Sequence, residues 1–319
     1  MVSVITPAYM AEKYIKRCIE SVKRQIYQEY EHIIVIQGNK DKTKEICEHY
    51  SLNDNKIRLF YVEENSNLCI NRNIGIRNSL GDWIAFLDAD DEFEPFFLSN
   101  LINNPAKNSA DIMMGLIVRK GIDWINKQEP YELCDTQTIS DTLLNEKNVL
   151  PFYIGIYKKD IFRYVSFDEN ISVMEDWLFM KEALLHSRNI CFVNSHGYIY
   201  WFNGENSLAW NKEYNYAKHI NKAHCNIYSH LKYYDELKDK GVDGQNILLS
   251  AFNIFFVYFL YSYIRKENFN KIDLFKESKI LSKYLREIKG FKRFRYLFFI
   301  RHPFISFKVF IFLRKFRLV

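Results

Sequence analysis

Apolar runs alternate with amphipathic stretches over the first 118 residues. Continuous apolar runs at residues 2–6, 33–36, 57–62 and 83–87 predict four strands, and amphipathic stretches at 11–26, 41–51 and 67–79 predict three helices between them. Strands that are apolar on both faces are typical of a parallel sheet covered by helices. The pattern therefore predicts a doubly wound α/β layer, in which ligands bind outside the carboxyl ends of the strands.

The pattern changes along the rest of the chain. Residues 119–150 are polar and irregular, residues 151–202 return to a mixed α/β pattern, and the pattern is helical from about residue 213. We predict an α/β domain over residues 1–212 and a helical domain over residues 213–319. The apolar run at 248–264 is short for a membrane span and carries Ser250, Asn253 and Ser262, so it predicts a buried helix of the second domain.

The composition is that of a folded intracellular protein. Of the 319 residues, 48% are hydrophobic and 17% aromatic, and the low content of Gly (11) and Pro (6) argues against disorder. The six cysteines show neither a C-x-x-C pair nor a metal-ligand spacing, which predicts reduced thiols. The chain opens on a strand pattern without a signal peptide, so we predict a cytoplasmic protein.

Positive charge is concentrated at the C-terminus. Residues 288–319 hold nine basic side chains and no acidic one, which leaves 35 basic and 39 acidic residues, a net charge of −4, for the rest. Basic residues interleaved with Phe, Ile and Leu over 291–319 are typical of a helix that lies on an anionic membrane surface. We predict peripheral attachment to the inner face of the cell membrane. A core helix with solvated cations is the alternative, and the acidic body argues against a nucleic-acid partner.

Three carboxylates follow the fourth predicted strand, at Asp88, Asp90 and Asp91. They repel one another unless a positive group lies nearby. In an extended chain Asp88 and Asp90 point the same way, so both can face one divalent ion, and their hard oxygen ligands suit Mn²⁺ or Mg²⁺. An acidic turn or a helix cap is the alternative interpretation.

Five motifs, taken in order, resemble bacterial glycosyltransferase family 2. They are VITPAY at 4–9, RNIG at 72–75, AFLDADD at 85–91, MEDWLF at 174–179 and ENSL at 205–208. The resemblance is best over residues 1–118. It implies a GT-A fold, a nucleotide diphosphate sugar as donor, a D-x-D metal site and inversion at the anomeric carbon. The acceptor would be a glycan of cell-surface polysaccharide or glycoprotein biosynthesis, lipid-linked or protein-linked.

The resemblance also implies roles for individual residues. Asp88 and Asp90 would hold the metal against the diphosphate. The donor nucleotide would be bound by residues from most of the motifs and from the end of the second strand: Pro7, Ala8, Tyr9, Gln37, Arg72, Asp88, Ala89, Asn206 and Ser207. Outside this resemblance, the alternative interpretation of Arg72 is a surface ion pair.

Glu175 and Asp176 begin an amphipathic run and would lie at a helix N-terminus. Acidic residues are stabilised there by the helix dipole, so a capping pair without catalysis is the alternative. Within the resemblance, Asp176 is the base that takes the proton of the acceptor hydroxyl, and Glu175 orients it or binds the acceptor.

The sequence departs from the family at two places. Gln37 stands where an acid is expected to accept the uracil N–H; its amide can accept that bond without charge assistance, or pair with a cytosine edge. We predict a uridine donor. Phe202 and Gly204 stand where relatives often carry Arg and His, which leaves diphosphate oxygens, water or His196 to complete the metal shell, although we expect His196 to be structural.

These departures leave a catalytically inactive, membrane-associated GT-A scaffold as the alternative function. A haloacid-dehalogenase-like phosphatase also ends a strand with D-x-D, but Thr or Val normally follows the second carboxylate there, and Asp91 follows it here. Release of nucleoside diphosphate from a donor sugar separates the three possibilities.

Overall fold

The computed structural model describes residues 1–38, 40–120, 133–135, 151–171, 174–201, 216–241, 243–264, 279–288 and 296. The chain divides into two compact units, Met1–Lys212 and Glu213–Val319. Within the described residues, no helix combines the length and the apolar character that a membrane span requires.

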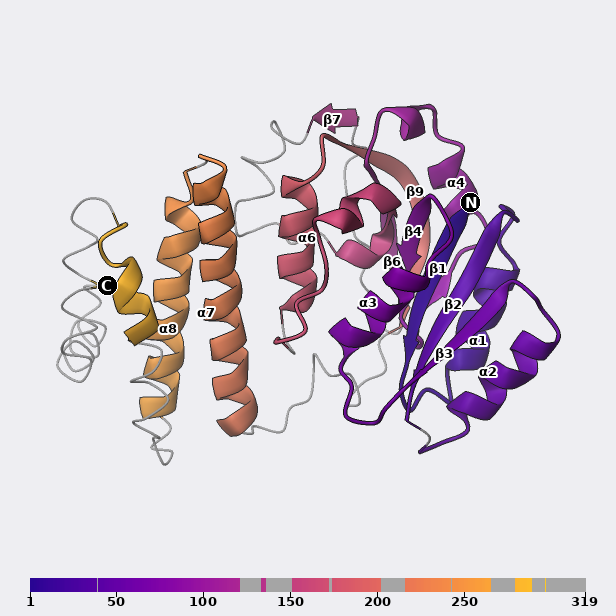
Figure 1. Cartoon of the computed structure of the whole chain (residues 1–319), viewed down its shortest axis with the longest axis horizontal. Helices are drawn as coiled ribbons and strands as arrows, with labels where there is room; N and C mark the ends of the chain where they lie inside the picture. Colours follow the sequence, from indigo (N-terminus) through magenta and orange to yellow (C-terminus); the bar gives the residue numbers. More distant parts are fainter. Residues whose placement is uncertain are drawn as a thin grey trace. The chain divides into compact units, whose positions relative to one another are not determined.

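The first half of the N-terminal unit is a parallel βα layer. Its strands are β1 (Val2–Ala8), β2 (Tyr30–Gln37), β3 (Ile57–Val62) and β4 (Trp83–Phe86), and its helices are α1 (Ile15–Lys23), α2 (Thr43–Leu52) and α3 (Leu68–Asn78). The strands pair in the order β3-β2-β1-β4, so the direction of winding reverses after β3. Right-handed crossovers then place α1 and α2 on one face and α3 on the other (Figure 1).

The second half of this unit extends the sheet with mixed pairing. It contains the strands β5 (Glu92–Phe93), β6 (Ile112–Lys120), β7 (Leu133–Asp135), β8 (Gly155–Lys158) and β9 (Asn189–Trp201). Its helices are α4 (Phe97–Ile102), α6 (Glu175–Leu185) and the 3-10 turns η1 (Pro105–Asn108), η2 (Phe152–Ile154) and η3 (Lys159–Arg163). The order continues β4-β8-β6-β9-β5, with β7 on β9. The α/β prediction is confirmed for this unit.

The predicted elements are present, with shifted ends. Every residue of β1 is buried, and the strand runs two residues beyond the predicted end, to Ala8. The helix predicted over 11–26 covers only Ile15–Lys23. It ends early because Gln25 leaves the helix and ties it to the segment after β5, donating to the carbonyl of Glu94 (2.8 Å) and accepting from the N–H of Leu98 (3.0 Å).

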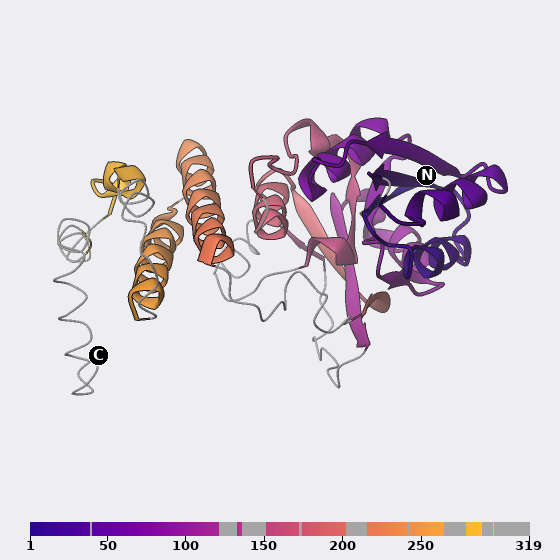
Figure 2. The ribbon, with the colours of Figure 1, turned by 90° about the horizontal axis from the view of Figure 1, so that it is seen from below.

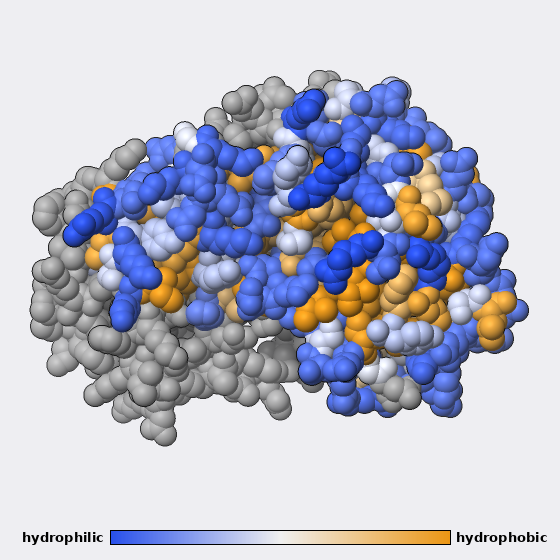
Figure 3. Space-filling view, viewed as in Figure 1, coloured by the Kyte–Doolittle hydropathy of each residue, from blue (hydrophilic) through white to orange (hydrophobic). Residues whose placement is uncertain are grey.

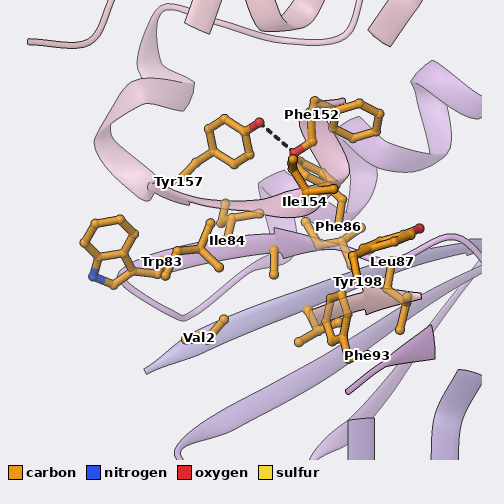
Figure 4. Packing of buried hydrophobic residues seen from close by; sticks show 14 of the residues in the cluster. Val2, Trp83, Ile84, Phe86, Leu87, Phe93, Phe152, Ile154, Tyr157 and Tyr198 are labelled. Carbon is orange, nitrogen blue, oxygen red and sulfur yellow. Dashed lines mark hydrogen bonds between the residues drawn. The ribbon is translucent and has the colours of Figure 1, made fainter. Parts of the chain in front are cut away.

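Aromatic side chains form the core beneath the end of β4. The ring of Phe86, the last residue of the strand, lies 5.4–6.1 Å from five other rings, those of Phe152, Tyr157, Phe162, Phe167 and Phe179. Figure 4 shows Phe86 against Phe152 and Ile154, with Tyr198, Leu87 and Phe93 nearby. On the face shown in Figure 3, hydrophilic residues predominate among the described residues, with apolar residues visible between them. These rings pack together beneath the last residue of β4 and so anchor the strand that carries the carboxylates.

The C-terminal unit contains α7 (Tyr216–Asp239) and α8 (Gln245–Ile264), which pack side by side (Figures 1 and 2). Leu231 and Tyr233 of α7 and Leu248 and Phe252 of α8 are buried. The predicted basic tail at 291–319 lies outside the described residues except for Tyr296. That tyrosine is buried, and its hydroxyl donates to Oδ1 of Asn253 on α8 (2.6 Å).

Candidate active site

The three carboxylates after β4 lie on a turn. The N–H of Leu87 still bonds to the carbonyl of Ile5 on β1 (3.0 Å), and then the N–H of Asp91 closes back onto the carbonyl of Asp88 (3.0 Å). The strand ends at Phe86, one residue earlier than predicted. The segment is therefore a turn and not the extended chain from which a shared direction of Asp88 and Asp90 was predicted, so strand alternation does not set their directions.

Arg72 joins two of the predicted motifs. Its Nη2 donates to Oδ1 of Asp88 (3.0 Å), and its Nη1 lies 3.5 Å from Oε1 of Glu175 at the start of α6. The side chain of Arg72 is only 2% exposed, and its guanidinium carbon lies 4.6 Å and 5.1 Å from the ring centres of Phe152 and Phe167. The alternative of a surface ion pair is wrong. The guanidinium is a buried link between the end of β4 and the start of α6.

The other residues of the RNIG motif explain how Arg72 reaches this place. Asn73 binds both backbone groups of Phe167, donating to its carbonyl (2.8 Å) and accepting from its N–H (3.0 Å). Gly75 lies so close to β1 that a Cβ atom would be 2.3 Å from Cγ2 of Ile5. Because only glycine permits that approach, α3 sits close enough to the sheet for Arg72 to reach the carboxylates.

The start of α6 combines acidic side chains with an unusual backbone. Met174, directly before Glu175, has φ of 69°, a left-handed conformation that a side chain such as Met rarely adopts. Oδ1 of Asp176 accepts from the N–H of Trp177 (2.7 Å). Burial raises the pKa of Glu175, and the Arg72 charge opposes that shift while Asp176 and Asp88 add to it. Strained backbone of this kind gathers at functional sites.

A second left-handed residue follows the predicted VITPAY motif. Among the described non-glycine residues, only Met10 (φ 48°) and Met174 have positive φ. Met10 directly follows the VITPAY motif, and Met174 is the first residue of the MEDWLF motif. In the motif itself, Ala8 is buried at the end of β1, whereas Tyr9 is exposed. The carboxyl end of β1 therefore presents Tyr9 on an irregular loop, in the position where ligands of doubly wound sheets bind.

Gln37 is engaged within the protein. Its amide nitrogen donates to the carbonyls of Glu64 (2.9 Å) and Ser66 (2.8 Å), and its Oε1 accepts from Nδ2 of Asn71 (2.9 Å). An amide group has two N–H donors, and both are used here. The oxygen keeps a second lone pair, so the remaining capacity of Gln37 is that of an acceptor.

Asp91 has a structural partner on β9. Its carboxylate accepts from the hydroxyl of Tyr198 (2.7 Å) and from the N–H of Trp201 (2.8 Å), and the Tyr198 hydroxyl also accepts from the N–H of Asp88 (3.3 Å). Burial raises the pKa of Asp91 to about 8, and the charges of Asp90 and Asp88 add to the shift. The third carboxylate of the cluster therefore holds the turn against the end of β9.

The turn offers two carboxylates, Asp88 and Asp90, to a divalent ion. Within the described part of the chain, no group of three or more His, Cys, Asp or Glu side chains could hold a metal. Mg²⁺ commonly uses one or two carboxylates together with substrate phosphates and water. Asp88 and Asp90 fit that demand, although one oxygen of Asp88 is already paired with Arg72.

Several expected residues lie outside the described part of the chain. These are Asn206 and Ser207 and the departures at Phe202 and Gly204, as well as the side chain of His196. Sequence reasoning also missed the residues that hold the turn, which are Arg17, Tyr198 and Trp201, and Glu92, which pairs with Arg17 and Trp201. None of them belongs to a recognisable motif, and Arg17 is one of several basic residues on an amphipathic helix, so no sequence signal distinguishes it.

Known proteins resemble this chain in sequence and in fold. Glycosyltransferase GlyA of Streptococcus pneumoniae is 27% identical over 229 residues, which are 68% of this chain and 33% of GlyA. The teichoic acid poly(glycerol phosphate) polymerase of Staphylococcus epidermidis is 28% identical over 213 residues, 64% of this chain and 28% of the polymerase. The chain thus spans about a third of these relatives.

The structure of S. aureus TarS 1–349 in complex with UDP-GlcNAc superposes with a TM-score of 0.70 at 16% identity, covering 96% of this chain and 89% of that one. At this identity the likeness shows a shared GT-A fold. The family model described as glycosyl transferase family 2 matches residues 3–166, which include the β1 end, the buried arginine and the carboxylate turn. The chain belongs to glycosyl transferase family 2.

Proposed function

We propose that this glycosyltransferase transfers a hexose or N-acetylhexosamine from a UDP-sugar to a glycan acceptor, with inversion and with help from Mn²⁺ or Mg²⁺. The observation that carries the proposal is the buried Arg72, which brings the carboxylate turn and the acidic start of α6 to one place. The teichoic acid polymerase among the relatives supports an acceptor in cell-surface polysaccharide biosynthesis, with glycoprotein as the other class.

The donor would lie at the carboxyl ends of β1, β2 and β4. Asp90 and the second carboxylate oxygen of Asp88 would hold the metal, which would neutralise charge on the leaving diphosphate. Tyr9, with Pro7 and Ala8 beneath it, would lie under the base and ribose, and Ala89 would contact the nucleotide from the turn. Asn206 and Ser207 would donate to the diphosphate. Because Arg72 is buried against Asp88, it would not contact the nucleotide directly. It would support nucleotide binding by holding the Asp88 carboxylate in place.

Gln37 supports uridine over cytidine. Both N–H groups of its amide are occupied by the carbonyls of Glu64 and Ser66, so toward a ligand the side chain can only accept. The ring N3 of uracil carries a hydrogen and donates, whereas N3 of cytosine accepts. A base that meets Gln37 through its ring N3 would therefore be uracil.

The transfer itself needs a base on the acceptor side. The Asp176 carboxylate would take the proton of the acceptor hydroxyl while that oxygen forms its bond to the anomeric carbon and the bond to the diphosphate breaks. Glu175 would orient Asp176 or bind the acceptor, because the ion pair with Arg72 holds the Glu175 carboxylate in place. The products would be the inverted glycoside and UDP.

A donor assay tests the proposal. The purified protein is incubated with a panel of UDP-hexoses and UDP-N-acetylhexosamines with and without Mn²⁺, and released UDP is measured. Metal-dependent release from one donor, and none from the CDP analogue of the same sugar, is the expected result. Phosphate release from simple phosphoesters would indicate a phosphatase. A protein that neither binds nor cleaves any donor would be the inactive scaffold.

We also propose that the basic tail attaches the protein to the inner face of the cell membrane. Support comes from the nine basic residues of 288–319 and the net charge of −4 elsewhere. Because Tyr296 packs on α8, the truncated chain should keep this residue. Deleting residues 297–319 removes five of the nine basic side chains. The truncated chain should lose binding to anionic vesicles, and binding of the intact chain should weaken with salt. Equal vesicle binding by both would contradict the attachment.

A further inference from the structure

Arg17 contacts the carboxylate turn from the side of α1. Its Nη2 donates to the backbone carbonyl of Asp90 (2.6 Å), and its Nε forms an ion pair with Oε1 of Glu92 (3.1 Å). Its guanidinium carbon lies 4.2 Å from the ring centre of Trp201 at the end of β9. One side chain therefore joins α1, the turn after β4 and the last residue of β9.

The partners of Arg17 are themselves held in place. The indole Nε1 of Trp201 donates to the same Oε1 of Glu92 (2.7 Å), and the N–H of Trp201 donates to Asp91 (2.8 Å). The guanidinium therefore contacts the Asp90 carbonyl, the Glu92 carboxylate and the Trp201 ring at once. A planar group with several donors suits such a fixed, multiple contact better than a lysine does.

We propose that Arg17 is a positioning residue that sets the direction of the Asp90 carboxylate toward the metal. The direction of a side chain depends on the backbone of its own residue, so a bond that fixes the Asp90 carbonyl limits where the carboxylate can point. Groups that orient a metal ligand in this way typically contribute about 10- to 100-fold in metal affinity. The inference rests on the proposed function, in which Asp90 holds the metal.

The test compares Arg17→Met with Arg24→Met. Arg24 is a matched control, because its Nη2 pairs with the other oxygen of Glu92 at 3.4 Å. The probe is Mn²⁺ with saturating UDP, and free Mn²⁺ is measured by electron paramagnetic resonance. Arg17→Met should weaken Mn²⁺ binding about 10- to 100-fold, whereas Arg24→Met should leave it within about threefold of the parent. Arg17→Lys, which keeps the charge and can donate to Asp90, should recover part of the loss.

Asp90→Ala separates the failure of this inference from the failure of the proposed function. If Asp90→Ala loses Mn²⁺ binding and folded Arg17→Met does not, the positioning role is wrong and the metal assignment stands. If Asp90→Ala binds Mn²⁺ as the parent does, the metal assignment is wrong and Arg17 has no ligand to position. If Arg17→Met does not fold, Arg17→Gln, which is shorter and uncharged, provides the measurement, and parent-like Mn²⁺ affinity in folded Arg17→Gln would overturn the inference.

Discussion

The two acidic groups of the site are held very differently. At the turn after β4, Arg72 binds Asp88, Arg17 binds the carbonyl of Asp90, and β9 binds Asp91. At the start of α6, Arg72 reaches Glu175 at the longer distance of 3.5 Å, and the backbone just before it is left-handed. The turn is fixed from three elements, whereas the helix start combines the long ion pair between Arg72 and Glu175 with strain.

This difference matches the tasks that we propose for the two groups. A site that stabilises the charge of a diphosphate works best when its polar groups are fixed in advance. A base must instead meet an acceptor that arrives separately, and contacts of this kind often tighten only when the substrate is bound. Arg72 belongs to both groups, so it connects the donor side to the acceptor side. Changing each group in turn tests whether the two tasks are separate.

The largest effect is expected at the turn. Asp90→Ala removes a metal ligand and should abolish metal-dependent nucleotide binding while the fold remains, because the residue's backbone contact to Arg17 does not need the side chain. Calorimetric titration of UDP with and without Mn²⁺, with circular dichroism as the check on folding, measures this. Unchanged nucleotide affinity in the presence of Mn²⁺ would remove the turn from the donor site.

The next effect should appear at the helix start and spare donor binding. Asp176→Asn keeps the shape of the side chain but cannot take a proton, so transfer should fall by about 10²–10⁴-fold, the usual contribution of a general base. UDP affinity should stay near that of the parent. Glu175→Gln serves as the comparison, and near-normal transfer by Asp176→Asn alongside a large loss in Glu175→Gln would assign the base to the other carboxylate.

Removing the shared arginine should affect stability as well as activity. Arg72→Met leaves Asp88 and Glu175 without their cation and should lower the free energy of unfolding by about 3 kcal/mol, as expected when one partner of a buried ion pair is lost. Arg77→Met on the same helix is the control. Arg77 is 61% exposed and lies 3.9 Å from Glu169, so its loss should cost less than about 1 kcal/mol. Urea denaturation measures both, and equal effects would mean that the link is not structural.

The smallest effect concerns the pH dependence of stability. Burial raises the pKa of Glu175 in the folded state, so the folded chain binds this proton more tightly than the unfolded chain does. The resulting stability is fully present below the unfolded pKa of about 4.3 and is lost as the pH rises through the folded pKa, with a slope of at most about 1.4 kcal/mol per pH unit. Glu175→Gln should flatten the fall in the free energy of unfolding above about pH 4.3 in denaturation experiments. An unchanged slope would mean that Glu175 is not buried as described.

The sequence by itself determined the α/β layer and the place of its motifs. Continuous apolar runs predicted β1 to β4 within a few residues, because a strand buried on both faces needs apolar side chains at every position. The acidic start of α6 was predictable in the same way, since the apolar spacing that follows Glu175 is local. The family, too, followed from motifs that are short in sequence and ordered along the chain.

Tertiary structure alone decided what the polar residues of those motifs contact. Arg72 pairs with Glu175 from 103 positions away, and Asp91 meets Tyr198 from 107 positions away. The sequence cannot specify such pairs, because hydrogen bonds depend on orientations that are set only when distant elements pack. The same reason applies to Gln37, whose amide looks available in the sequence but is occupied by the loop after β3, and to Arg17, which resembles any other cation on an amphipathic helix until the turn and β9 close around it.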